Sequence, residues 1–180
     1  ITETDLVFGH IGRFAPEKNH GFMLEFFGEW LKSHGSKNKL LFVGDGGLRD
    51  EIQHRAEQMG LQDHVIFFGT TDCAWEIYPA FDYFLFPSTF EGFGMSVLEA
   101  QACGLPVVAF DCPFGPSEII TDGVDGFLIP NDNLEDFANK ICLLIENEKL
   151  RKDMGNRAYH NSKRFAEEKV MPMWVHLFNE

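Results

Sequence analysis

Two glutamates, Glu91 and Glu99, stand eight positions apart on either side of a glycine-punctuated turn. A short apolar run before them predicts a buried strand, and the residues from Met95 onward predict a helix. Gly92 and Gly94 let the backbone adopt positive φ or approach a ligand closely. The first turn of a helix offers free N–H groups and the positive end of its dipole, and both attract phosphate. Two carboxylates around such a phosphate cradle suit a ligand with hydroxyl groups on both sides of a phosphate, such as a nucleotide sugar.

A second polar loop, with Gly12, Arg13 and Lys18, follows the first apolar run of the chain. Its two cations could neutralise phosphate, although charge alone equally fits a pair of solvated loop residues. The chain has 15 basic and 28 acidic residues and a net charge of −13. This balance argues against nucleic acid or anionic lipid as a partner. A phosphate site must therefore be built locally, from a few cations and backbone N–H groups.

The segment from Pro87 to Val108 reads Pro-Ser-x-x-Glu-Gly-Phe-Gly, then four residues, then Glu-Ala-x-Ala-x-Gly-x-Pro-Val-Val. This pattern resembles the signature of retaining GT-B glycosyltransferases of family 4, the group 1 type. Residues 12–19 are similar to the phosphate-binding segment of that family. Residues 43–46 and 118–126 resemble its further motifs and follow in the family's order. Four ordered motifs between Phe8 and Pro130 are far more specific than a bare pair of glutamates.

The resemblance implies a role for each polar residue of the two loops. Arg13 and Lys18 would hold the two phosphates of the donor and stabilise the departing nucleoside diphosphate. Glu91 would contact the donor sugar and so act, with these cations, in catalysis, while Glu99 would accept hydrogen bonds from the ribose. Without the motifs, Glu91 could equally cap a helix, and Glu99 could simply favour a helix dipole. The further donor-binding positions would be Gly12, Gly44, Gly46, Thr70, Gly92, Phe93, Gly94, Met95 and Ser96.

Apolar runs alternate with helical patterns along the chain, which predicts an α/β fold with a doubly wound, mostly parallel, Rossmann-like sheet. Near-continuous hydrophobicity suits parallel strands that are covered on both faces. The predicted strands are 6–9, 40–43, 65–68, 83–86, 107–109 and 126–129. The predicted helices are Asn19–Ser33, Leu48–Met59, Ala74–Ala80, Met95–Ala102 and Asn133–Asn147. Ligands of such sheets lie beyond the carboxyl ends of the strands, where these loops fall.

Residues 1–180 are expected to form a single domain with an amphipathic helical tail over 150–180. By resemblance this would be the C-terminal, donor-binding half of a GT-B enzyme, without the N-terminal half that binds the acceptor. No apolar run is long enough for a membrane span, and no signal peptide opens the chain. The four cysteines form no C-x-x-C pair and are expected to be buried and reduced, as in a cytoplasmic protein.

The resemblance implies transfer of a sugar from a nucleoside-diphosphate sugar, with UDP favoured, to a hydroxyl acceptor with retention. The expected mechanism is front-face displacement assisted by the departing phosphate. It needs no cofactor and no bound metal, and the histidines show no metal-ligand spacing. The acceptor would be a glycan or a lipid-linked glycan, at the inner face of the cell membrane, and the isolated domain would turn over little. The alternatives are a GT-B phosphorylase and a non-catalytic nucleotide-binding or regulatory module.

Overall fold

A single parallel sheet of six strands, in the order β3-β2-β1-β4-β5-β6, forms the centre of the molecule. The computed structural model describes residues 5–34 and 38–179. The strands are β1 (Leu6–Ile11), β2 (Asn38–Val43), β3 (Val65–Gly69), β4 (Tyr83–Phe86), β5 (Val107–Phe110) and β6 (Gly126–Ile129). All neighbouring strands pair in parallel. The doubly wound fold predicted from the sequence is confirmed.

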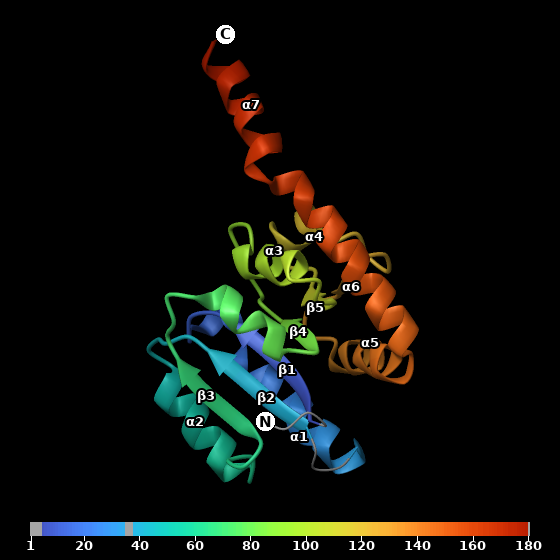
Figure 1. The fold of residues 1–180 in the computed structure, drawn as a ribbon. Helices are drawn as coiled ribbons and strands as arrows, with labels where there is room; N and C mark the ends of the chain where they lie inside the picture. The colour runs from blue at the N-terminus through green and yellow to red at the C-terminus, as the bar shows by residue number, and fades with distance from the viewer. Residues whose placement is uncertain (1–4, 35–37, 180) are drawn as a thin grey trace.

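Helices cover both faces of this sheet (Figure 1). Alternate residues of each strand therefore enter two separate cores. On β4, for example, Tyr83 and Leu85 face one core while Phe84 and Phe86 face the other. The first core packs against α1 (His20–His34), α2 (Arg49–Gln58) and α5 (Leu134–Glu146). The second packs against α3 (Met95–Ala102) and α4 (Pro116–Ile119).

The helix predicted over Ala74–Ala80 is wrong. This segment forms two short 3-10 helices, η2 (Ala74–Glu76) and η3 (Tyr78–Ala80). Pro79 explains the break, because it has no N–H to donate to a carbonyl four residues earlier. The change matters for the site, since η3 places the Tyr78 side chain in the second core.

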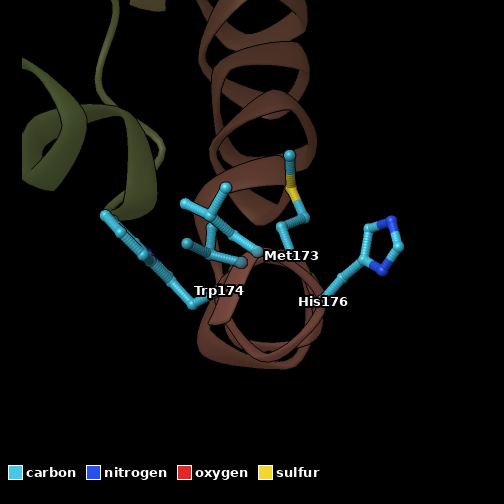
Figure 2. Close-up of a pocket in the computed structure, with 5 residues that line it drawn as sticks. Met173, Trp174 and His176 are labelled. Carbon is cyan, nitrogen blue, oxygen red and sulfur yellow. The ribbon is translucent and has the colours of Figure 1, made fainter. Parts of the chain in front are cut away.

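The expected helical tail forms α6 (Glu148–Ser162), a short 3-10 helix, η4 (Lys163–Phe165), and α7 (Glu167–Phe178). Helix α6 packs closely on the end of α3, because a Cβ on Gly155 would lie 2.2 Å from the carbonyl oxygen of Gly104. Helix α7, in contrast, projects away from the sheet (Figure 1). Figure 2 shows the side chains of Met173, Trp174 and His176 around the free end of α7. The hollow there is lined by residues of this one helix, so it is not a site built by the fold.

The four cysteines are free thiols. Cys112 is buried, but Cys103 is exposed at the end of α3. The expectation that all of the thiols are buried is therefore wrong for Cys73 and Cys142, which are half-buried, and for the exposed Cys103. For Cys103 the reason is local, since α3 ends one residue earlier and its C-terminal end faces solvent.

Candidate functional site

The order in which the chain adds strands reverses between β1 and β4, which are neighbours in space although residues 12–82 separate them in the chain. In doubly wound sheets, ligands bind outside the carboxyl ends of the strands at this switch point. The loop after β1 contains Arg13 and Lys18, and the loop after β4 contains Glu91. The backbone N–H of Thr89 donates to the carbonyl oxygen of Glu17 at 2.9 Å, which joins the two loops directly.

Lys18 and Glu91 form an ion pair across this switch point, with 2.5 Å between Lys18 Nζ and Glu91 Oε1. Their side chains are only 17% and 10% exposed. The Lys18 ammonium also lies 5.4 Å from the centre of the Phe86 ring at the end of β4. The fold thus brings together two residues predicted for the site that are distant in sequence, and it leaves the lysine with a carboxylate partner that a phosphate would have to share or replace.

Arg13 does not join this pair. Its guanidinium donates to Glu17 Oε1 at 2.9 Å, and its side chain is 72% exposed. The arginine therefore lies at the solvent edge of the same loop. A long exposed side chain can swing toward a ligand at low energetic cost, because an exposed ion pair of this kind contributes little stability.

Gly44 and Gly46 allow the turn after β2 to pack against the loop after β1. A Cβ on Gly44 would lie 2.0 Å from the carbonyl oxygen of Gly12, and one on Gly46 would lie 2.5 Å from that of Phe14. Both glycines also have positive φ, 139° and 154°. The structure thus supplies a packing reason for both glycines, and their predicted contact with the nucleotide stays a prediction.

Helix α3 begins at the loop that contains Glu91. Its N-cap is Gly94, in the left-handed region with φ 89°, and no side chain caps it. The N–H groups of Met95 and Ser96 belong to the first turn, where a helix has no internal acceptors for its N–H groups. Because Gly94 has no side chain to occupy this end, an anion can approach these N–H groups and the positive end of the dipole.

Glu99 lies in the second turn of α3, and a tyrosine hydroxyl from η3 forms a hydrogen bond with its carboxylate. Tyr78 donates its hydroxyl proton to Glu99 Oε2 at 2.7 Å, and the same hydroxyl lies 3.2 Å from the carbonyl oxygen of Ser96. Burial, and then the hydrogen bond to Glu99 and its charge, raise the pKa of Tyr78 far above its usual value. Sequence reasoning assigned no role to Tyr78, and the only signal was a polar hydroxyl in a largely apolar segment.

A hollow of about 380 Å³ lies beside Glu99, between α3 and the segment after β3. Its lining residues are Thr71, Asp72, Ala74, Trp75, Tyr78, Glu99, Ala102 and Cys103. Thr70, the residue predicted for this region, is exposed and precedes the lining segment by one position.

In the loop after β4, the carbonyl of Phe93 packs against Gly115, where a Cβ would lie 2.4 Å from that oxygen. Gly92 has open space around its Cα.

Two histidines lie under the loop after β1. His10 is fully buried and donates from Nδ1 to the carbonyl oxygen of Leu85 at 2.9 Å. Burial, aided by the charge of Lys18, lowers the pKa of His10 to about 4. His20 packs edge-on against it with ring centres 4.9 Å apart, and burial also lowers the pKa of His20. Both imidazoles are therefore neutral near pH 7, and the charge of Lys18 acts on both of them.

The family model for glycosyl transferases group 1 matches residues 1–161. The chain belongs to this family. Within residues 5–34 and 38–179 of this group 1 chain, no three His, Cys, Asp or Glu side chains are placed to hold a metal ion. In the same ranges no helix has the length and apolar character that a membrane crossing requires.

Two curated relatives illustrate the family. The poly(ribitol-phosphate) alpha-N-acetylglucosaminyltransferase of Staphylococcus aureus is 33% identical over 178 residues, which cover 98% of the group 1 chain and 36% of the relative. The amylovoran biosynthesis glycosyltransferase AmsD of Erwinia amylovora is 31% identical over 169 residues, covering 94% and 47% respectively. The chain thus spans between a third and a half of the length of these relatives.

Solved structures agree with this assignment. A variant of S. aureus TarM in complex with fondaparinux, alpha-GlcNAc-glycerol and UDP has a TM-score of 0.92 at 32% identity, with 98% of the group 1 chain and 36% of TarM covered. Anabaena HepE in complex with UDP has a TM-score of 0.89 at 26% identity, with coverages of 98% and 49%.

Proposed function

We propose that this chain is the donor-binding domain of a retaining glycosyltransferase that uses a UDP-sugar. The single observation that carries the proposal is the arrangement at the switch point. Lys18 and Glu91 form an ion pair there, the loop that contains Glu91 leads into the uncapped first turn of α3, and Glu99 lies one turn further along the same helix. Cation, helix N-terminus and two carboxylates match a diphosphate between two hydroxyl-bearing groups. The UDP complexes of TarM and HepE support uridine as the base.

The chemistry requires the bond between the anomeric carbon and the diphosphate to break with its electron pair on the departing oxygen. Lys18, Arg13 and the N-terminus of α3 stabilise the charge that develops there, and they do so more in the transition state than in the ground state. The acceptor oxygen attacks on the same face, and its proton passes to the departing phosphate, so the configuration is retained. In this proposal the positive field of these groups replaces a divalent metal, and no cofactor takes part.

Other features of the whole enzyme are also proposals. The acceptor is a hydroxyl of a glycan or lipid-linked glycan, and it is bound by a separate N-terminal domain. The relatives named for poly(ribitol-phosphate) and amylovoran support a place in polysaccharide or glycopolymer synthesis. We place this synthesis in the cytoplasm at the inner face of the membrane, where nucleotide sugars are available.

Calorimetry with the 180-residue chain tests the proposal. UDP should bind with micromolar to millimolar affinity, and EDTA should leave the affinity unchanged. Glu99→Ala should weaken the binding of UDP by roughly 1.5–3 kcal/mol, because charged hydrogen bonds to the ribose are lost. Glu51→Ala, which removes an exposed glutamate in the first turn of α2, is the matched control and should bind as the parent does. A folded chain that gives no heat with any nucleoside diphosphate would contradict the proposal.

A further inference from the structure

Glu99 is half-buried beside the hollow, and a buried hydroxyl from a distant segment contacts one of its two oxygens. We propose that Tyr78 is a positioning residue for Glu99. Its hydroxyl fixes the carboxylate so that the remaining lone pairs face the ribose of the nucleotide. This inference rests on the proposed function and assigns to it a residue that acts through Glu99.

The direction of the hydrogen bond is determined by counting protons. A tyrosine hydroxyl has one proton, while an ionised carboxylate and a carbonyl are both acceptors. The hydroxyl of Tyr78 lies 2.7 Å from Glu99 Oε2 and 3.2 Å from the Ser96 oxygen. The shorter contact to the charged acceptor is the stronger one, so the Tyr78 hydroxyl donates its hydrogen bond to Glu99. The raised pKa of Tyr78 keeps this proton in place at every working pH.

Tyr78 is itself held rigidly. It is fully buried. Its ring packs edge-on against Phe81 with centres 6.0 Å apart, and at a tilt against Phe84 of β4 with centres 5.7 Å apart. The position of the hydroxyl is therefore set by the central sheet rather than by a mobile loop. A glutamate side chain has several rotamers, and a fixed donor that selects one of them reduces the entropy lost on binding.

The rest of the carboxylate opens toward the hollow of about 380 Å³ that Tyr78 and Glu99 both line. An ionised carboxylate accepts about four hydrogen bonds, and Tyr78 uses one of them. The ribose 2′- and 3′-hydroxyls can occupy two of the others. A ligand without these hydroxyls leaves lone pairs of a half-buried carboxylate unpaired, so a fixed Glu99 should discriminate against it.

Tyr78→Phe removes the hydroxyl and keeps the ring. Calorimetry with the 180-residue chain should compare UDP with 2′,3′-dideoxyuridine diphosphate. The variant should bind UDP about tenfold more weakly, since an oriented charged hydrogen bond is lost. It should bind the dideoxy nucleotide as the parent does, so the preference for ribose shrinks. Tyr83→Phe is the matched control, because Tyr83 is equally buried and its hydroxyl accepts a 2.7 Å hydrogen bond from Arg151 on the other face of the sheet. It should keep the full preference.

A double-mutant cycle provides the second test. In a Glu99→Gln background, Tyr78→Phe should weaken the binding of UDP by less than about twofold, because the charge that Tyr78 positions is gone. Equal losses for both nucleotides, or the same loss in Tyr83→Phe, would overturn the inference and leave the proposed function standing. If the parent chain itself bound no UDP, that result would contradict the proposed function, and with it the inference.

A measurement on the unaltered sequence covers the case in which Tyr78→Phe does not fold. The chain has three tyrosines, so 3-fluorotyrosine labelling gives three fluorine signals. Tyr83→Phe and Tyr159→Phe identify the signal of Tyr78 by elimination. That signal should shift with UDP and stay in place with the dideoxy nucleotide. The same response to both nucleotides, or to neither, would overturn the inference.

Discussion

Glu91→Gln should lower the stability of the unliganded chain and yet tighten its binding of UDP. The variant keeps the shape of the side chain and removes the charge that faces Lys18 at 2.5 Å. Breaking a buried ion pair costs about 3–5 kcal/mol, and the residual exposure of 17% and 10% favours the lower value of about 3 kcal/mol. For a domain of this size, about 3 kcal/mol corresponds to a melting temperature lower by about 6–12 °C.

The affinity for UDP should rise, because the carboxylate of Glu91 competes with the diphosphate for Lys18 and also repels the diphosphate. At a separation of about 5 Å, this repulsion is roughly 1 kcal/mol with water-like screening and roughly 3 kcal/mol at an effective dielectric constant near 20. UDP should therefore bind about fivefold more tightly or better. In the full-length enzyme, turnover should fall, because the proposed contact of Glu91 with the donor sugar is altered.

Thermal denaturation and calorimetry measure these two quantities on the same samples. Glu29→Gln is the control, since Glu29 and Lys32 form an ion pair at 2.6 Å whose side chains are 68% and 72% exposed. An exposed pair contributes at most about 1 kcal/mol, so this variant should melt close to the parent. If Glu91→Gln melts like Glu29→Gln, or if it binds UDP more weakly than the parent does, the competition for Lys18 does not exist.

Three further predictions concern the loop after β1 and its neighbours. Arg13→Ala should cost less than about 0.5 kcal/mol of stability, because its side chain is 72% exposed, yet calorimetry should show weaker binding of UDP and unchanged binding of uridine. Gly44→Ala should cost about 2–5 kcal/mol in urea denaturation, since its Cβ would lie 2.0 Å from a carbonyl oxygen at φ 139°, whereas Gly47→Ala, with open space, should be close to neutral. The lowered pKa of His10, about 4, means that the unfolded chain takes up a proton that the folded chain excludes between about pH 6.5 and 4. Stability should therefore fall with decreasing pH in that window by about 1.4 kcal/mol per unit for this group, and His10→Asn should flatten the slope by that amount.

The strands and most helices could be predicted from the sequence because the local signals are strong. The predicted strand Tyr83–Phe86 and the predicted helix Met95–Ala102 coincide with β4 and α3 at both ends. An aromatic run and a helix-forming segment bounded by glycines specify these elements almost without tertiary context. At Ala74–Ala80 the apolar pattern favoured one helix. The segment forms two 3-10 helices instead, because Pro79 has no N–H for a helical hydrogen bond.

The partners within the site could not be predicted, because they depend on the sheet topology. Lys18 and Glu91 lie 73 positions apart, and Tyr78 and Glu99 lie 21 apart on different elements. No periodicity relates such positions, so sequence reasoning assigned roles to Lys18, Glu91 and Glu99 one by one. It assigned Gly44 a contact with the nucleotide, which stays a prediction, and it missed the close packing of this turn against the loop after β1.

The pairing of β1 with β4 also has a consequence for how the protein folds. Strands β1, β2 and β3 can associate through contacts between near neighbours in sequence, and this half already contains Arg13 and Lys18. The half with β4, β5 and β6 contains Glu91, Glu99 and the N-terminus of α3. Non-local pairings of this kind are slow because they close long loops. Binding of UDP would therefore report the moment at which the two halves dock, and a nucleotide added during refolding would stabilise only chains that have completed this step.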